Sequence, residues 1–205
     1  MIAIIDYGAG NIQSVSKALR HIGCDCFVTR DSEKILTADS AVLPGVGSFG
    51  DTVDSLNRFG IRDAAVDFIK SGKPFLGICL GLQLLFPGSE ESPDAQGLGI
   101  FGGTITKIPN GEGLKIPHMG WNSLDIKKGS RLFKGIEEHP YVYFVHSYYL
   151  TAQSRDIVAA QTHYGVAIDA AVEQDNVFAT QFHPEKSGDT GLRILKDFAD
   201  IAEGR

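Results

Sequence analysis

The stretch GICLGLQ, residues 77–83, places a cysteine between two glycines, where an apolar run gives way to a helical pattern. Gly77 and Gly81 have no Cβ atoms to crowd a sharp turn from strand to helix, so Cys79 can sit exposed in strained backbone. The free N–H groups at the start of the following helix favour a thiolate and, later in a reaction, an oxyanion. The spacing therefore predicts a nucleophile, against the alternative of a buried structural cysteine.

A thiol nucleophile needs a base, and the base needs a group that orients it. His183 follows the apolar run NVFAT and precedes Pro184, which favours extended backbone. In an extended chain residues i and i+2 project to the same side, so Glu185 can hold one ring nitrogen while the other faces Cys79. We predict a Cys79, His183 and Glu185 triad, although a lone histidine at a strand end is more often a surface or capping residue.

The other five of the six histidines have weaker contexts. His21 falls on a predicted helix, and His139 and His163 fall in turn or strand contexts. His118 and His146 fall in predicted loops that could line the same edge of the sheet. We therefore give none of them a place in the triad.

The run LPGVGSFGD ends another apolar segment in glycines. Gly45 and Gly47 leave the Val46 peptide free to turn its N–H outward, where it could join the Leu80 N–H in an oxyanion hole. As a bare pattern the run is equally typical of an ordinary strand-to-helix turn. The earlier run DYGAGN resembles half of a dinucleotide fingerprint but lacks the full GxGxxG pattern, so we expect no nucleotide there.

These residues need a scaffold whose strands end at one edge. The run IAII is followed by a helical stripe of Ile12, Val15, Leu19 and Ile22, and the unit recurs at CFVT, AVLP and PFLGI, the last followed by LGLQLLF. Apolar strands that alternate with helices indicate an α/β fold with an open, mostly parallel sheet flanked by helices. The carboxyl ends of its strands form the edge that bears the site.

After about residue 88 the pattern changes to strands punctuated by glycine and proline: IFGGTITKI, YVYFV, DIVAAQTHY, AIDAAVEQ and NVFATQF. One helix follows, near TGLRILKDFADIA. No linker-like or low-complexity stretch separates the two halves. We therefore expect additional, mixed or antiparallel strands on the same core, and a single domain over residues 1–205.

Size, charge and cysteine content exclude several classes of protein. The net charge of −6 suggests no nucleic-acid partner and no anionic membrane surface. No apolar run approaches the roughly 18 residues of a membrane span, and MIAIID lacks a basic signal region, so the expected location is cytoplasmic. The three cysteines are expected to be reduced, with Cys24 and Cys26 packing in a strand rather than binding a metal.

The motifs resemble those of the class I (triad) glutamine amidotransferases, whose GxCxGxQ elbow and HPE pair match GICLGLQ and FHPEKS. Within that family DYGAGN, LPGVGSFGD, IPHMGWN, YFVHSYY and QFHPEKS, in this order, are similar to the branch of glutaminase subunits of imidazole glycerol phosphate synthase, from histidine biosynthesis. The resemblance covers nearly the whole chain. It implies a flavodoxin-like fold, no cofactor, no metal, and hydrolysis of L-glutamine to L-glutamate and ammonia through a thioester on Cys79.

The resemblance also implies which residues hold glutamine. They are Gly47, Gln83 and the backbone around Ser147 and Tyr148. Gln83 lies one helical turn beyond the nucleophile, so its amide can reach the same pocket, although a solvent-facing helix residue is the simpler alternative.

By the same resemblance, ammonia passes to a (β/α)₈ barrel cyclase subunit in a heterodimer. That subunit makes imidazole glycerol phosphate and aminoimidazole carboxamide ribotide. Asn11 and Lys186 are expected to lie toward the partner, although Lys186 also fits a plain solvated charge. The free subunit is expected to be nearly inactive until the PGVG strand presents its N–H. We assign no chemistry to Trp121 and Asn122, which could be packing residues.

Two other functions stay open at this point. One is a different cysteine hydrolase on the same scaffold, such as a γ-glutamyl peptidase or an amidotransferase of another pathway, against which IPHMGWN and HSYY argue. The other is a non-catalytic α/β interaction module, which predicts no thioester on Cys79.

Overall fold

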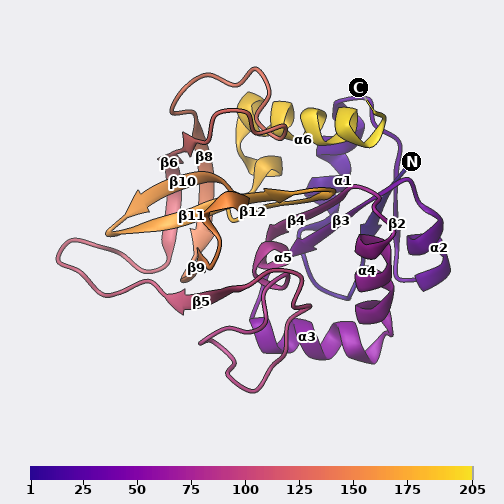
Figure 1. Ribbon diagram of the computed structural model, residues 1–205, viewed down its shortest axis with the longest axis horizontal. Coiled ribbons are helices and arrows are strands. Elements are labelled where there is room, and N and C mark those ends of the chain that lie inside the picture. The colour runs from indigo at the N-terminus through magenta and orange to yellow at the C-terminus, as the bar shows by residue number, and fades with distance from the viewer. Residues whose placement is uncertain (205) are drawn as a thin grey trace.

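A computed structural model describes residues 1–204, and in its first half short strands alternate with helices (Figure 1). The strands are β1 Ile2–Ile5, β2 Cys26–Thr29, β3 Ser40–Gly45 and β4 Phe75–Cys79. The helices are α1 Ile12–His21, α2 Ser32–Thr37, α3 Phe49–Arg58, α4 Ile61–Lys70 and α5 Leu80–Gln83. This alternation follows the apolar runs and helical stripes of the sequence.

The second half of the chain consists mostly of strands. They are β5 Gly103–Lys107, β6 His118–Ser123, β7 Asp125–Ile126, β8 Tyr141–His146, β9 Tyr148–Ala152, β10 Val158–Tyr164, β11 Val166–Gln174 and β12 Val177–Thr180. Two single-turn 3₁₀ helices, η1 Arg155–Ile157 and η2 Pro184–Lys186, interrupt them. The long helix α6 Gly188–Ala202 follows η2.

One eight-stranded sheet joins the two halves in the order β2-β1-β3-β4-β12-β11-β10-β7. Strands β2, β1, β3, β4 and β12 are parallel to one another, whereas β12, β11, β10 and β7 pair antiparallel. Two smaller antiparallel ladders join β5 to β9 and β6 to β8. The predicted fold class is therefore confirmed, including the additional antiparallel strands of the second half.

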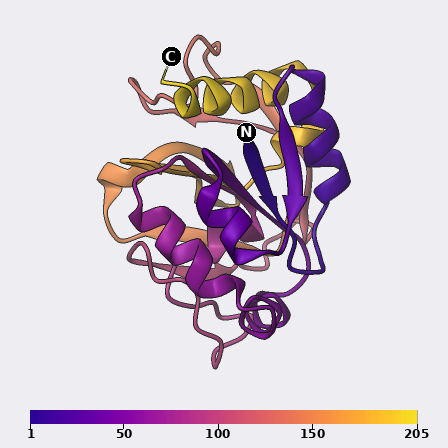
Figure 2. The same cartoon turned by 90° about the vertical axis from the view of Figure 1, so that its right-hand side faces the viewer.

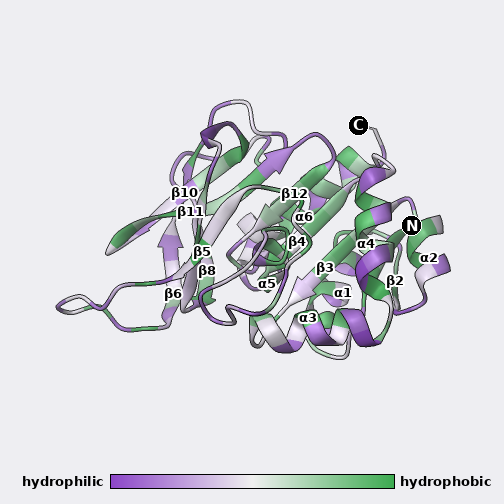
Figure 3. Cartoon of the chain, turned by 60° about the horizontal axis from the view of Figure 1, so that its bottom comes forward, coloured by the Kyte–Doolittle hydropathy of each residue, from purple (hydrophilic) through white to green (hydrophobic). Residues whose placement is uncertain are grey.

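Side chains of the central strands enter two apolar cores, one on each face of the sheet. Ala3 and Ile5 of β1 pack in the core that includes α2, α3 and α4, whereas Ile2 and Ile4 pack in the core that includes α1 and α6. Successive side chains of a strand point to opposite faces, so a strand covered on both sides reads as a continuous apolar run. Figures 1 and 2 show these helix layers on either side of the sheet, and Figure 3 shows the hydrophobic central strands between them.

The helix after the nucleophile is shorter than the sequence predicts. The pattern LGLQLLF indicates a helix through Phe86, yet α5 ends at Gln83. The carbonyl of Leu84 instead accepts a hydrogen bond from the N–H of Leu98 at 2.7 Å, in a loop that folds back over this segment. A tertiary contact therefore replaces the next helical turn.

Three strands, β6, β7 and β9, lie where the sequence predicts none. The segments IPHMGWNS and SYYLTA contain β6 and β9, and Gly120, with its φ of 134°, interrupts the apolar alternation that would have revealed β6. The prediction that His118 and His146 lie in loops is wrong. They are the first residue of β6 and the last of β8, and they are opposite each other in the ladder.

Three neighbouring strands bring the motifs of the sequence together. In the register of the sheet, Gly45 at the end of β3 is opposite Cys79 at the end of β4, and Thr180 at the end of β12 is opposite Ile78. The segments that follow these strand ends therefore meet at one edge, as expected for an open parallel sheet. Within residues 1–204, no helix combines the length and apolar character needed to cross a membrane.

Candidate active site

Cys79 occupies a strained turn between β4 and α5. Its φ of 56° and ψ of −105° lie where residues with side chains are rarely found. The glycines around it are required by close backbone contacts: a Cβ atom on Gly77 would lie 2.6 Å from the carbonyl oxygen of Gly81, and one on Gly81 would lie 2.0 Å from the carbonyl oxygen of Leu43. The turn therefore needs both glycines to hold the sulfur at the edge of the sheet.

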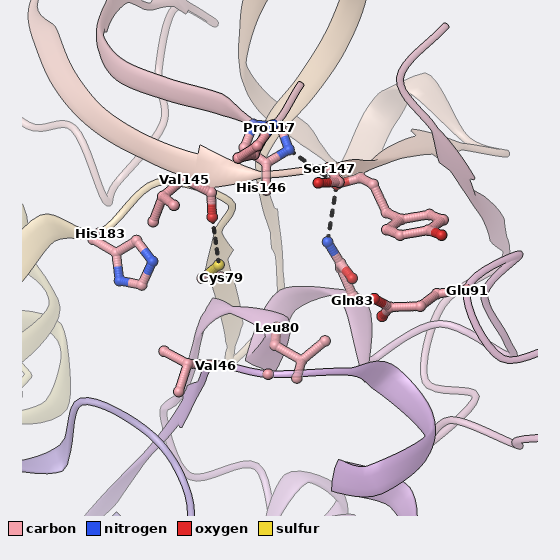
Figure 4. A pocket seen from close by; sticks show the side chains of 12 residues that line it. Val46, Cys79, Leu80, Gln83, Glu91, Pro117, Val145, His146, Ser147 and His183 are labelled. Carbon is pink, nitrogen blue, oxygen red and sulfur yellow. Dashed lines mark hydrogen bonds between the residues drawn. The ribbon is translucent and has the colours of Figure 1, made fainter. Parts of the chain in front are cut away.

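The sulfur reaches a cavity of about 380 Å³, although Cys79 is only 7% exposed (Figure 4). The PGVG segment, the start of α5 and the corner between β8 and β9 form its walls. The cavity is large enough for an amino acid. Eight residues named in the sequence analysis as functional line it: Val46, Gly47, Cys79, Leu80, Gln83, Ser147, Tyr148 and His183.

His183 and Glu185 form a buried pair beside the nucleophile. Nδ1 of His183 lies 2.8 Å from Oε1 of Glu185, and the two side chains are 2% and 1% exposed. His183 has the extended backbone that the sequence predicts, but Glu185 lies in η2, the 3₁₀ turn that begins at Pro184. The pair is therefore formed by a tight turn, which corrects the expected geometry of two alternate residues in extended chain.

The surroundings of His183 favour its protonated form. Burial acts to lower the pKa of His183, but the acidic groups of Cys79 and Glu185 outweigh burial and raise this pKa to about 10. Nε2 of His183 has no hydrogen-bond partner among the described residues. We therefore attribute the effect of Cys79 on the pKa of His183 to charge. Figure 4 shows the imidazole beside Cys79. This arrangement suits an imidazolium next to the Cys79 sulfur.

Two protein groups contact the Cys79 sulfur. Sγ of Cys79 lies 3.9 Å from the carbonyl oxygen of Val145 and 3.7 Å from Nε2 of Gln181. The sequence analysis assigns no role to Gln181, although this residue belongs to the QFHPEKS motif. Its side chain is fully buried, and a polar residue directly after the apolar strand β12 is the signal that could have identified it.

The PGVG segment also borders the cavity. Val46 is 36% exposed, and Gly47 has a φ of 96°, which favours glycine. Beneath the segment lies the fully buried Tyr7, whose pKa is raised to about 12 by burial, with the Val46 N–H acting in the opposite direction. Among the described residues the Tyr7 hydroxyl has no hydrogen-bond partner, and the turn of the Val46 N–H toward an oxyanion, together with the Leu80 N–H, stays a prediction.

Gln83 is buried and lies at the cavity wall, not in solvent. Its Nε2 donates to the carbonyl oxygen of Tyr148 at 3.0 Å and to Oε1 of Gln181 at 3.1 Å. The Ser147 and Tyr148 backbone is thereby tied to α5 across the cavity. The predicted substrate-binding residues therefore lie together, although their contact with glutamine is untested.

The two residues expected at a partner interface differ in their surroundings. Nδ2 of Asn11 lies 3.3 Å from Oε1 of Glu185, so this residue contacts the predicted triad. Lys186 is exposed, and its Nζ lies 5.9 Å from the centre of the Tyr143 ring. Contact of either residue with a partner stays a prediction.

His118 and His146 form a buried chain of hydrogen bonds that begins at the cavity wall, which His146 lines. Nδ1 of His146 lies 2.9 Å from the Tyr148 carbonyl oxygen, and its Nε2 lies 3.0 Å from Nδ1 of His118. Nε2 of His118 lies 3.3 Å from Nδ2 of Asn122. Because a carbonyl oxygen accepts only, each histidine carries its proton on Nδ1. Burial lowers the pKa of His118 to about 4 and that of His146 to about 3.

One acidic side chain at the cavity was also missed. Glu91 lines the cavity, and its Oε2 accepts a hydrogen bond from the N–H of Phe49 at 2.8 Å. A carboxylate at this position complements the ammonium group of an amino acid. Glu91 lies in the loop SEESPD, where the sequence carries no motif. No cluster of metal-ligating side chains occurs within residues 1–204.

Comparison with known proteins now identifies the family. The family model described as glutamine amidotransferase class-I matches residues 3–202. Two solved structures share the fold: a glutamine amidotransferase with a TM-score of 0.78 at 18% identity, covering 99% of this chain and 100% of that one, and PurLQS from Thermotoga maritima, with a TM-score of 0.76 at 21% identity, covering 98% and 97%. The chain belongs to the class I glutamine amidotransferases and is an enzyme of that class.

Two relatives are much more similar in sequence. The imidazole glycerol phosphate synthase subunit HisH of Caldanaerobacter subterraneus subsp. tengcongensis is 51% identical over 201 residues, covering 98% of both chains. The protein of the same name from Methanothermobacter thermautotrophicus is 52% identical over 201 residues, again covering 98% of both chains.

Proposed function

We propose that Cys79, His183 and Glu185 hydrolyse the side-chain amide of L-glutamine. One observation carries the proposal: a strained cysteine and a histidine line one cavity of suitable size, and a buried carboxylate lies within hydrogen-bond distance of that histidine. The chain functions as the glutaminase subunit of imidazole glycerol phosphate synthase in histidine biosynthesis, because its similarity to such subunits extends over nearly its whole length at about 50% identity.

The reaction begins when the Cys79 sulfur attacks the carboxamide carbon of glutamine. A C–S bond forms, the carbonyl electrons move to oxygen, and the imidazolium of His183 gives its proton to the leaving nitrogen. The C–N bond then breaks, which releases ammonia and leaves a thioester. Water attacks the thioester while His183 takes a proton from it, and cleavage of the C–S bond releases glutamate. Glu185 keeps the ring oriented throughout.

The cavity walls supply the remaining roles in this proposal. The N–H groups of Val46 and Leu80 stabilise the oxyanion of the tetrahedral intermediate once the PGVG segment turns inward. Gly47, Gln83, Ser147 and Tyr148 hold the substrate, and their common position on the cavity supports this assignment.

We propose that the partner subunit is a (β/α)₈ barrel cyclase, which receives the ammonia in a heterodimer. Free ammonia is protonated in water, so a site that produces it benefits from direct transfer to a second site. The β6–β8 ladder presents an apolar patch, defined as Met119, Trp121 and Tyr141, with exposures of 65%, 56% and 62%. Such a patch is typical of a protein interface.

The patch continues toward the triad. The rings of Trp121 and Tyr143, which are opposite each other in the ladder, lie 6.2 Å apart, and Tyr143 in turn contacts Lys186. Lys186 directly follows Glu185, and Asn11 hydrogen-bonds to Glu185. This continuity supports a partner interface that includes Asn11 and Lys186.

We propose that residues 1–205 form one glutamine amidotransferase domain and that the protein is located in the cytoplasm. Pairing of β4 with β12 joins the two halves of the chain in one sheet, which supports the single domain. The free thiols of Cys24, Cys26 and Cys79 fit a reducing compartment.

Cys79→Ala tests the proposed chemistry. The full chain is assayed with a barrel cyclase subunit, using glutamine or ammonia as the nitrogen source. We expect the variant to lose glutamine-dependent turnover by at least about 1,000-fold and to retain ammonia-dependent turnover, because only the first needs the thioester. Cys26→Ala is the matched control and keeps both activities. Glutamine hydrolysis at the wild-type rate in Cys79→Ala would contradict the proposal.

The same assay distinguishes the proposed function from that of a free-standing cysteine hydrolase and from that of a non-catalytic module. An amidotransferase of this branch gains glutaminase activity when the cyclase subunit is added. A free-standing cysteine hydrolase is fully active alone and gains nothing. A non-catalytic module forms no thioester on Cys79 under either condition.

A further inference from the structure

Gln181 contacts the nucleophile with a side chain that does not line the cavity. It follows β12, and its backbone N–H donates to the carbonyl oxygen of Ala170 at 2.8 Å, which anchors it to β11. Its side chain is 0% exposed and is not part of the cavity wall. A buried amide with no access to substrate must act on its protein neighbours.

The hydrogen-bond network determines which end of the Gln181 amide faces the sulfur. The carbonyl oxygen of Tyr148 can only accept, so the group of Gln83 that lies 3.0 Å from it must be its NH₂. That NH₂ also lies 3.1 Å from Gln181, which therefore presents its own Oε1 there. The remaining end of the Gln181 amide, its NH₂, lies 3.7 Å from Sγ of Cys79.

The two protein contacts of the sulfur favour opposite protonation states. The carbonyl oxygen of Val145, at 3.9 Å, accepts from a thiol but repels a thiolate. The NH₂ of Gln181 donates to the sulfur and is strengthened when the sulfur becomes negative. Because Gln181 is fully buried, water does not weaken this interaction.

We propose that Gln181 is a further catalytic residue, which donates a hydrogen bond to the Cys79 thiolate. The inference rests on the proposed function, because it assigns Gln181 a role at the same sulfur. The proton that leaves Sγ passes to Nε2 of His183, and the Gln181 donor then holds the anion in place for attack. The link to Gln83 keeps the Gln181 amide from rotating, so Gln83 acts on the nucleophile as well as on the cavity.

Gln181→Leu removes the donor while keeping a side chain of similar size. The rate at which iodoacetamide alkylates Cys79 is measured against pH in the full chain, with the Cys79 peptide followed by mass spectrometry. We expect the midpoint of this pH profile to rise by about one unit, which corresponds to about tenfold less thiolate well below the midpoint. Glutaminase kcat at pH 7 falls about tenfold and recovers as pH rises, and ammonia-dependent turnover is unchanged.

Gln161→Leu is the matched control. Gln161 is a partly buried glutamine of β10 that hydrogen-bonds to Asp169 at 3.0 Å, far along the sheet from the thiol. Its substitution leaves the alkylation profile unchanged, so any general effect of losing a buried amide is excluded. Thermal unfolding of both variants shows whether each is folded.

Gln181→Glu is the second variant, and it serves if Gln181→Leu does not fold. It keeps the shape and the Oε1 acceptor but places a carboxylate oxygen against the sulfur, so the alkylation midpoint rises further than in Gln181→Leu. An unchanged midpoint in the folded variants would overturn the inference. Failure of the proposed function can be distinguished from failure of this inference. If the proposed function is wrong, Cys79→Ala retains the wild-type rate of glutamine hydrolysis whatever the Gln181 variants do.

Discussion

His118 and His146 are neutral residues on the buried face of the β6–β8 ladder, and His146 also lines the cavity. The ring of His118 is stacked between those of Phe144 and Tyr164, with centroids 4.6 and 4.0 Å away. Each histidine has its single proton committed to Nδ1 by the chain of hydrogen bonds that ends at Tyr148. A second proton on either ring would remove the acceptor that its neighbour needs.

This arrangement predicts a loss of stability in acid. In the unfolded chain both rings take up a proton near pH 6.5, whereas in the folded protein they do so only near pH 4 and pH 3. Their contribution is therefore fully present above pH 6.5 and is lost as pH falls toward 4. The free energy of unfolding, measured by urea titration, should fall by a few kcal/mol over this range.

The double variant His118→Gln, His146→Gln should show a weaker pH dependence of unfolding between pH 6.5 and pH 4. His21→Gln, at an exposed histidine, is the control and should keep the wild-type dependence. His183 does not interfere, because its raised pKa affects stability between pH 6.5 and about pH 10. If the free energy of unfolding depends on pH equally in the wild type and the double variant, groups other than these two histidines cause the dependence.

The element that positions Cys79 is the turn from β4 into α5. Three glycines allow its backbone to pack closely: a Cβ on Gly45 would lie 2.6 Å from the N atom of Gly81, in addition to the contacts of Gly77 and Gly81. The strain at Cys79 is maintained by this packing, because the neighbouring strand β3 leaves the turn no room to relax. The edge position of the sulfur is thus a property of two strands and not of the loop alone.

Gly81→Ala should disrupt this turn. The added Cβ would lie 2.0 Å from the Leu43 carbonyl oxygen, so β3 and α5 must separate. We expect a loss of about 3 kcal/mol or more in the free energy of unfolding, together with a loss of Cys79 alkylation and glutaminase activity. Gly88→Ala is the control, because its added Cβ has no neighbour closer than 3.6 Å. Similar stability of the two variants would contradict the steric explanation.

At the scale of the whole molecule, the β6–β8 ladder separates two environments. One face carries Met119, Trp121 and Tyr141 and is exposed, whereas the other carries Phe144 and the two neutral histidines and is buried. The alternation of side chains across a strand produces this division. A partner that covers the patch would therefore contact the same strands that support the Ser147 and Tyr148 corner of the cavity.

Trp121→Ala tests this surface. Large aromatic side chains at the centre of an interface typically contribute about 2 kcal/mol or more, so we expect the dissociation constant for the cyclase subunit to rise at least about 30-fold. Calorimetric titration of the two subunits measures this change. Leu36→Ala, on the distant helix α2, removes another exposed apolar side chain and should leave affinity unchanged. Wild-type affinity of Trp121→Ala would place the interface elsewhere.

Much of the site could be predicted from the sequence because its constraints are local. The glycines flanking Cys79 mark a turn with no room for Cβ atoms, and His183 and Glu185 are two residues apart in one short turn. The alternation of apolar runs with helical stripes likewise indicated the parallel sheet, since each element buries its own apolar face. The family resemblance added the predicted substrate-binding residues, which local patterns alone do not specify.

Other features were decided by the tertiary structure. Gln181 contacts a sulfur 102 positions away in the chain, and His118 pairs with a histidine 28 positions away. Such contacts depend on which strands become neighbours and in what register, and neither residue carries a local mark of its partner. The sequence alone determined where a nucleophile, a base and an orienting carboxylate could form. The packing of β12 beside β4 and of β6 beside β8 decided which buried groups surround them, because burial and strand order are properties of the assembled sheet.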